Sequence, residues 1–358
     1  MTAKRPFDVA IVGGGPVGLV AALETSKHSS AVLVMDRMPE VQGSPRLEAV
    51  PSAFINLLIG FGVHPGRIGV DRLHDARYVA WEGHSPRTIC GPSAAYLERP
   101  ALERELFQLV ARSNRLSIQM ESVRPSFDGE WWSGPSWCSR SLIDATGRRA
   151  MSAHRKVRPP KPWVARTFWT SRPQASADRT LRIAALPFGY AYRLGSSRYD
   201  TLGLAGRGEY LKGPPELLER AIKDTRGSWI LEGLPSLMAL STGPAYPVSV
   251  QWSQGVASLA IGDAILARDI LSSQGLSTGV SEAIYAAAIR TDADVGLCRT
   301  RQRDQREAHL ESLAELIANC RFRDRDNWVE YRTFVSKHRA PVRNQKKVGL
   351  VAGQIVER

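Results

Sequence analysis

One stretch of the sequence decides the fold: residues 7–37, which read FDVAIVGGGPVGLVAALETSKHSSAVLVMDR. The apolar run at residues 7–12 predicts a buried strand, and residues 31–35 predict a second one. Between them the glycines of residues 13–18 predict a turn, and residues 19–26 predict a helix that packs on a sheet. A strand, a helix and a second strand within about 30 residues are typical of a parallel sheet.

The glycine turn follows the pattern G-x-G-x-x-G. In this pattern the first glycine allows the tight turn, the second lets a diphosphate approach the backbone, and the third lets helix and strand pack closely. A diphosphate would lie at the helix N-terminus, where unpaired N–H groups and the helix dipole favour negative charge. Asp36 ends the second strand, where a carboxylate accepts hydrogen bonds from a ribose. We therefore expect a dinucleotide site, and a plain turn between closely packed elements is the alternative. The residues expected to bind here are Gly13, Gly15, Pro16, Val17, Gly18, Asp36 and Arg37.

Later segments predict the remaining parts of this unit. Residues 100–112 carry leucines at helical spacing, and residues 141–144 form a short apolar strand. Residues 256–261 predict another buried strand, and residues 279–290 predict a helix. One face of a later amphipathic helix is marked by Leu310, Leu313, Ile317 and Cys320.

The middle of the chain has a different pattern. Four runs predict strands of an antiparallel sheet: residues 164–169, 180–185, 190–194 and 200–205. We expect an α/β fold, in which a Rossmann-like dinucleotide-binding domain carries an inserted antiparallel-sheet domain for the substrate. The expected boundaries are residues 1–155 for the first part of the binding domain, 156–250 for the substrate domain, 251–338 for the second part with the C-terminal helices, and 339–358 for a basic, loosely docked tail.

Composition excludes some classes of protein. The chain has 48 Lys and Arg against 35 Asp and Glu, a formal net charge of +13. Its arginines are scattered, so we expect a basic solvated surface and no nucleic-acid partner. No apolar run is long enough to span a membrane. The histidines and the four cysteines lack the spacing of a metal site or a disulfide framework, so we expect no metal and a reducing, cytoplasmic location.

With the later segments in view, the chain resembles the flavoprotein monooxygenases of the para-hydroxybenzoate hydroxylase fold, particularly their tryptophan halogenase-like relatives. The matching residues are Gly13-Gly14-Gly15-Pro16-Val17-Gly18, Asp36-Arg37, Arg99, Asp144-Ala145-Thr146-Gly147-Arg148 and Gly262-Asp263-Ala264. The resemblance implies FAD as cofactor, with Arg99 near its diphosphate, Asp263 on its ribitol and residues 271–279 against the flavin ring. The further cofactor residues expected from it are Arg46, Arg99, Thr146, Gly147, Gly262, Asp263, Gln274, Gly275 and Leu276. Turn-forming roles for Asp144 and Asp263, and a helix-capping role for Arg99, are the alternatives.

The chain departs from the family at several places. Proteins of this fold often read G-D-A-x-H, followed by a proline before the glycine stretch, whereas Leu266 and Ile270 stand there in this chain. Halogenases of the group need a particular lysine and glutamate, but residues 28–155 contain no lysine and Ser272 occupies the glutamate position. Halogenation is therefore disfavoured.

A looser resemblance points to a reaction. Residues 272–276 and 322–328 resemble flavoproteins that hydroxylate a tryptophan during maturation of a peptidyl quinone cofactor. It implies a monooxygenase that uses O₂ to hydroxylate an aromatic substrate, such as tryptophan or indole, free or within a peptide or protein. NAD(P)H as a transient reductant, or a separate flavin reductase as a partner, would supply the electrons.

Two tyrosines are the candidate substrate contacts. Tyr190 and Tyr192 alternate along one predicted strand, where packing within the sheet is the alternative role. The sequence identifies no general base. Two other functions stay open: an FAD-dependent oxidase or reductase that inserts no oxygen, and a flavin-binding protein that has lost its catalytic activity.

Overall fold

The chain forms two compact units. The computed structural model describes residues 4–39, 46–122, 124–152, 155–157, 163–171, 180–234, 237–245, 248–251, 258–269, 274–289 and 292–338. Unit 1 comprises Met1–Gly43, Pro100–Arg158 and Tyr246–Arg306, and unit 2 comprises Ser44–Arg99, Pro159–Ala245 and Glu307–Arg358.

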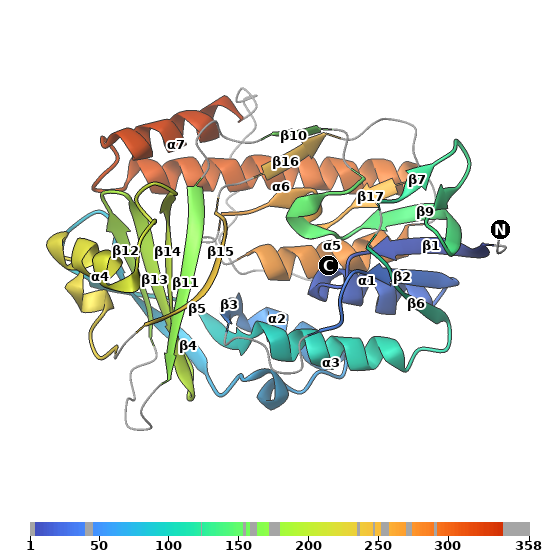
Figure 1. Ribbon diagram of the computed structural model, residues 1–358, viewed down its shortest axis with the longest axis horizontal. Helices are drawn as coiled ribbons and strands as arrows, with labels where there is room; N and C mark the ends of the chain where they lie inside the picture. The colour runs from blue at the N-terminus through green and yellow to red at the C-terminus, as the bar shows by residue number, and fades with distance from the viewer. Residues whose placement is uncertain are drawn as a thin grey trace. The chain divides into compact units, whose positions relative to one another are not determined.

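Parallel strands form the main sheet of unit 1 (Figure 1). Its strands are β1 (Arg5–Val12), β2 (Ala31–Met35), β6 (Leu116–Met120), β7 (Ser126–Phe127), β8 (Trp132–Ser133), β9 (Trp137–Asp144) and β17 (Ser258–Ala260). Their order is β6-β2-β1-β9-β8-β7, and β17 also pairs with β9. The central strands β6, β2, β1, β9 and β17 are parallel to one another, whereas β7 and β8 join in antiparallel register. Every residue of β2 is buried, as expected for a parallel strand covered on both faces.

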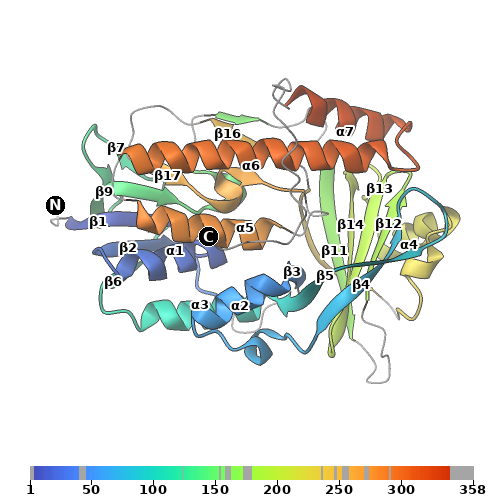
Figure 2. The same ribbon diagram turned by 180° about the vertical axis from the view of Figure 1, so that it is seen from behind.

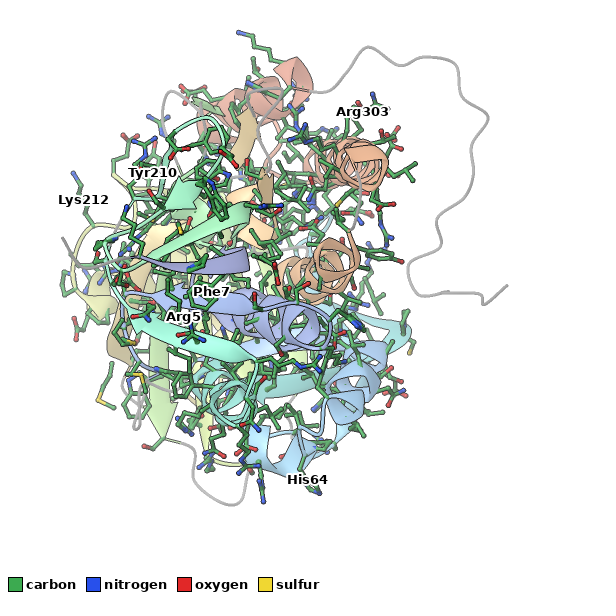
Figure 3. All side chains as sticks on the ribbon, turned by 90° about the vertical axis from the view of Figure 1, so that its right-hand side faces the viewer. Arg5, Phe7, His64, Tyr210, Lys212 and Arg303 are labelled. Carbon is green, nitrogen blue, oxygen red and sulfur yellow. The ribbon has the colours of Figure 1, made fainter. Side chains whose placement is uncertain are left out.

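Aromatic side chains cover one face of this sheet. Phe7, Trp132 and Trp137 pack with the apolar residues of β1, β2 and β9 in one buried cluster. Arg5 lies over the ring of Phe7 at the start of β1, with 5.1 Å between its guanidinium carbon and the ring centroid (Figure 3). The antiparallel pair β7–β8 therefore supplies side chains that shield the parallel strands from water.

Helices complete unit 1. They are α1 (Pro16–Ser26), α3 (Arg99–Ala111), α5 (Gly275–Ala288) and the short 3₁₀ turns η2 (Gly147–Arg149) and η4 (Gly262–Ala264), and α6 (Asp292–Ala318) begins in unit 1. Figure 3 views α1 and α5 end-on, side by side. Their close approach depends on Gly279, because a Cβ atom there would lie 2.7 Å from Cγ2 of Val17. A small sheet of β10 (Arg155–Val157), β16 (Val248–Gln251) and β18 (Leu266–Ala267) completes this unit.

Unit 2 is built on one large sheet (Figure 2). Its strands are β3 (Leu47–Pro51), β4 (Leu73–Ala80), β5 (Arg87–Glu98), β11 (Trp163–Ser171), β12 (Leu181–Leu186), β13 (Gly189–Gly195), β14 (Tyr199–Arg207) and β15 (Met238–Pro244). They follow the order β15-β11-β14-β13-β12-β4-β5-β3. All neighbours are antiparallel except β4 and β12, which run parallel.

Helices pack on this sheet. Unit 2 contains α2 (Ser52–Gly60), α4 (Pro215–Asp224), α7 (Asp326–Lys337) and the 3₁₀ turns η1 (Pro65–Ile68) and η3 (Ser228–Ile230). α4 buries Leu218 and Ile222 against the apolar residues of β12 and β14. α7 is attached by Trp328, which is 1% exposed and whose indole Nε1 donates to the carbonyl oxygen of Leu186 at 2.9 Å.

Most expected elements lie where the sequence pattern placed them. β2 matches residues 31–35, and the four middle strands are β11 to β14. Leu310, Leu313, Ile317 and Cys320 are all buried, as the helical face predicted. The compact units nevertheless differ from the expected boundaries, because residues 47–98 contribute β3, β4 and β5 to the sheet of unit 2. The expected tail, residues 339–358, lies outside the described residues.

None of the helices in the described ranges is both long and apolar enough to cross a membrane.

Candidate functional site

Four parallel strands of unit 1 end at one edge of their sheet. β2, β1, β9 and β17 are neighbours in that order, so the segments that follow them lie side by side. These segments begin at Asp36, Gly13, Ala145 and Ile261. In open α/β sheets, ligands bind at the carboxyl ends of the strands. The structure therefore gathers four of the expected cofactor segments, far apart in the sequence, at such an edge.

The glycine turn is shaped by close backbone contacts. Gly13 has φ +122°, which L side chains rarely adopt, and a Cβ atom there would collide with the carbonyl oxygen of Ala145. A Cβ atom on Gly18 would collide with the carbonyl oxygen of Gly13. Gly15 precedes α1 and Pro16 is its first residue, and no side chain caps this end of the helix. The N–H groups of the first helical turn are therefore available to an anion.

The turn after β9 is held rigidly by Asp144. Its Oδ1 accepts hydrogen bonds from the backbone N–H and the hydroxyl of Thr146, at 2.9 and 2.6 Å. Its Oδ2 accepts from the backbone N–H and the hydroxyl of Ser152, at 2.8 and 2.7 Å. Asp144 is 1% exposed, so its carboxylate organises the turn itself, which is the alternative that the sequence left open. Gly147 follows with φ +61° and has no neighbour within 4 Å of a Cβ atom.

Two adjacent arginines on η2 contact the expected cofactor acids. Arg149 Nη1 lies 2.6 Å from Oδ2 of Asp36, and Arg148 Nε lies 3.8 Å from Oδ2 of Asp263. Both acids retain exposed surface, with 35% of the Asp36 side chain and 41% of the Asp263 side chain accessible. The sequence pattern did not predict a role for Arg149, because a lone arginine beyond a turn has no signature of its own.

A buried ion pair supports the turn that carries Asp263. Glu282 on α5 accepts a hydrogen bond at 2.6 Å from the N–H of Gly262, whose φ is +59°. The other carboxylate oxygen of Glu282 lies 3.7 Å from Nη2 of Arg268. Burial raises the pKa of Glu282 and lowers the pKa of Arg268, because each charge is costly away from water, and their mutual attraction opposes both effects. Neither residue was predicted, although both lie within 20 positions of Gly262.

The start of α5 lies beside the same turn. Gln274 is its N-cap and makes no side-chain capping hydrogen bond, and Gly275 is its first residue. A Cβ atom on Gly275 would lie 3.8 Å from Oδ1 of Asp263. Leu276 is 6% exposed and packs inward. Residues 271–273 of the expected flavin stretch lie outside the described residues.

The other expected cofactor residues belong to unit 2. Arg99 Nη1 donates to Oε1 of Glu48 at 2.9 Å, and Arg46 Nη2 lies 3.6 Å from the same oxygen. Burial would raise the pKa of Glu48, but the two guanidinium groups outweigh it and hold the pKa below its usual value. Glu48 is therefore the anion that positions both arginines, and the sequence pattern did not indicate it. Roles for Arg46 and Arg99 in cofactor binding stay predictions.

The two candidate substrate contacts have different surroundings. Tyr190 is 1% exposed, and its ring centroid lies 6.2 Å from that of Trp81 and 6.2 Å from that of Trp163. Tyr192 lies opposite Gly203 in β14, and a Cβ atom on that glycine would collide with the tyrosine ring. Both tyrosines have the surroundings expected for packing within the sheet, which was the alternative role for this pair. A substrate contact by either residue stays a prediction.

No group of His, Cys, Asp and Glu side chains among the described residues could hold a metal ion.

The chain is similar to a curated protein over part of its length, and no protein-family model matches it. The 3-demethoxyubiquinol 3-hydroxylase of Escherichia coli (strain K12) is 32% identical over 106 residues, which are 28% of this chain and 26% of that protein. The chain therefore matches about a quarter of the length of this curated relative.

Two solved structures cover nearly the whole chain. The myxobacterial chondrochloren halogenase CndH, described as a new variant of FAD-dependent halogenases, is similar with a TM-score of 0.75 and 17% identity, over 92% of this chain and 86% of that chain. The peptidyl tryptophan dihydroxylase QhpG, essential for tryptophylquinone cofactor biogenesis, is similar with a TM-score of 0.67 and 16% identity, over 92% and 79% of the two chains. The chain has the fold that FAD-dependent halogenases and aromatic hydroxylases share, and this confirms the expected fold class.

Proposed function

We propose that the chain is an FAD-dependent monooxygenase that hydroxylates an aromatic substrate. The observation that carries this proposal is the edge of the unit 1 sheet, where an uncapped helix follows a glycine turn between two acidic residues, Asp36 and Asp263. An extended dinucleotide needs this combination: an anion site in the middle and hydrogen-bond acceptors for hydroxyl groups on either side.

The residues at this edge fit FAD. The N-terminus of α1 would hold the diphosphate, Asp36 would accept hydrogen bonds from the ribose of the adenosine, and Asp263 would accept them from the ribitol. The turn has no room for a Cβ atom at Gly13 or Gly18, which fits the tight turn and the close helix packing of a diphosphate-binding motif. In addition, Nη1 of Arg268 is buried without an acceptor among the described residues. Because an unpaired buried donor costs about 1–3 kcal/mol, a ligand oxygen beside it would be stabilising.

When bound, FAD would supply the oxidation and reduction chemistry, including the activation of O₂. The chain's own residues would bind and orient the cofactor. Glu282 holds the N–H of Gly262 and so fixes the turn that presents Asp263. The N-terminus of α5, which lacks a side-chain cap, would favour negative charge on a ligand beside it. Electrons would come from NAD(P)H that binds transiently or from a separate flavin reductase.

An aromatic substrate is supported by the similar proteins. QhpG acts on a peptidyl tryptophan, and the curated relative is named for the hydroxylation of a demethoxyubiquinol. We propose tryptophan or an indole, free or within a peptide or protein, as the substrate class, with Tyr190 and Tyr192 as its candidate contacts. Arg46 and Arg99 are the proposed cofactor residues of unit 2.

The reaction is tested with isotopically labelled oxygen. The FAD-loaded protein is incubated with indole, tryptophan and tryptophan-containing peptides under oxygen-18 gas, with NADH, NADPH or a flavin reductase as electron source. Incorporation of one labelled oxygen atom into an aromatic product is expected. An oxidised product without label would overturn the proposal in favour of an oxidase, and a halogenated product in the presence of chloride or bromide would assign the chain to the halogenases.

A second function is favoured by one residue. Leu266 is 3% exposed and pairs in β18, at the position where related proteins often carry a histidine near the cofactor. A flavin-binding protein without catalytic activity would tolerate this loss of a polar group. Under argon, a failure of NADH, NADPH and a reductase to bleach the bound flavin would favour this second function.

A further inference from the structure

An ion pair occupies the proposed ribose site. Nη1 of Arg149 lies 2.6 Å from Oδ2 of Asp36, the carboxylate proposed to accept hydrogen bonds from the adenosine ribose. A ribose hydroxyl is a neutral donor, and a guanidinium group binds a carboxylate more strongly. A ribose hydroxyl can therefore bind this carboxylate oxygen tightly only if the guanidinium group of Arg149 moves to another anion.

The surroundings of Arg149 indicate which anion that is. Arg149 ends η2, whose preceding residues Ala145 and Thr146 lie against Gly13 of the glycine turn. Asp144 fixes the shape of this segment through four hydrogen bonds, so the backbone that carries Arg149 is rigid. The side chain itself is 65% exposed and can rotate. Asp36, which Arg149 contacts, follows β2, and the glycine turn follows β1. These two segments are neighbours because β2 and β1 are paired strands.

We propose that Arg149 is a diphosphate ligand that leaves Asp36 when the cofactor binds. This inference rests on the proposed function. The ribose takes the carboxylate of Asp36, and the guanidinium group of Arg149 moves to the phosphate oxygens at the N-terminus of α1. The exchange replaces one charge pair by another, and the exposed Arg149–Asp36 pair is of the kind that contributes little to stability. Arg149 thereby couples recognition of the ribose to the presence of the diphosphate.

If Arg149 moves to the diphosphate, its substitution should affect the binding of ADP and of adenosine differently. A purely structural ion pair predicts no such difference. ADP supplies both the ribose and the diphosphate, whereas adenosine supplies only the ribose. Arg149→Gln should weaken ADP binding about tenfold, because one charge-assisted hydrogen bond to phosphate is lost. The same variant should bind adenosine as tightly as the wild-type protein or more tightly, because Asp36 is then unpaired. Arg149→Lys should retain part of the ADP affinity, since it keeps the charge and loses the fork geometry.

The test is a calorimetric titration of the cofactor-free full chain with ADP, adenosine and FAD, at low and high salt. Arg115→Gln is the matched control: Arg115 is also exposed, but it lies at the opposite, amino edge of the same sheet, where it donates to the carbonyl oxygen of Lys27 at 3.0 Å. This control should leave all three affinities unchanged, and equal thermal unfolding of the variants should show that each is folded.

The outcomes separate the two proposals. Weaker ADP binding by Arg149→Gln together with unchanged or tighter adenosine binding, and a salt dependence of ADP binding that is weaker than in the wild-type protein, would support the exchange. Equal ADP affinity in Arg149→Gln and the wild-type protein, or equal losses for ADP and adenosine, would overturn it and leave the proposed FAD site intact. If the wild-type protein binds neither FAD nor ADP, the proposed function is wrong and the exchange is wrong with it.

Discussion

Single glycines set the geometry of the proposed phosphate site. A Cβ atom on Gly18 would collide with the carbonyl oxygen of Gly13, whereas a Cβ atom on Gly60, within helix α2, would meet nothing within 4 Å. We expect Gly18→Ala to lower the free energy of unfolding by about 2 kcal/mol or more, through forced backbone shifts. Gly60→Ala should raise it by about 0.5–1 kcal/mol, because alanine restricts the unfolded chain. Denaturant unfolding of the cofactor-free protein measures both, and equal effects would contradict the packing described for Gly18.

The cysteines should differ strongly in reactivity. Cys90 is exposed, whereas burial raises the pKa of Cys298 and of Cys320 to about 11. Near pH 8 only about 0.1% of each buried thiol would be ionised, and thiolate is the reactive form. A disulfide reagent should modify Cys90 rapidly and the two buried thiols only after unfolding. Mass mapping checks this, with Cys90→Ser as the control that removes the rapid phase, and rapid labelling of Cys320 in the folded protein would contradict the burial.

At the scale of elements, strand β3 of unit 2 carries a glutamate that is held between two arginines of the same unit. Arg99 at the start of α3 and Arg46 before β3 hold the pKa of Glu48 below its usual value, despite its burial. A lowered pKa means that the stabilisation is present above the unfolded value of about 4.5 and is lost as the pH falls through the folded value. Glu48→Gln should therefore lower the free energy of unfolding by about 1–2 kcal/mol at neutral pH, allowing for partial exposure. The difference from the wild-type protein should shrink below pH 4.5, and a constant difference across this range would contradict the ion pair.

Helix α7 depends on one indole. Trp328 is 1% exposed, packs edge-on against Trp163 with ring centroids 5.0 Å apart, and donates to the carbonyl oxygen of Leu186. Trp328→Ala should lower the free energy of unfolding by about 3–5 kcal/mol, through the cavity and the lost hydrogen bond. Trp328→Phe should cost about 1–3 kcal/mol, because it keeps most of the packing and leaves a buried carbonyl without its donor. Denaturant unfolding measures both, and equal losses would indicate that packing contributes little here.

At the scale of the whole molecule, the sequence predicted local elements better than long-range pairing. The parallel strands, the glycine turn and the four middle strands follow from apolar periodicity and turn residues, which act over a few positions. The pairing of β4 with β12 could not be predicted this way, because it joins residues about 100 positions apart. For the same reason residues 47–98 were expected in the first domain, although their strands complete the sheet of unit 2.

The candidate site likewise contains residues that a local pattern predicts and residues whose role depends on a distant partner. Gly13, Gly18 and Asp36 were predicted because they belong to a motif in which each position has a known task. Arg149, Glu48 and Glu282 were not, since a single charged residue has no local pattern and acquires its role from a partner in space. The similar solved structures share the fold at 16–17% identity, so they do not assign these side chains either.

The most direct measurement is the binding of FAD to the purified chain. Spectroscopic titration with FAD should show saturable binding of one flavin per chain, with a dissociation constant of about 1 µM or lower, and Gly18→Ala should abolish it. Thermal unfolding in excess FAD should shift upward in the wild-type protein and not in this variant. A colourless protein that binds no FAD at concentrations well above this range would contradict the proposed cofactor site and the monooxygenase function built on it.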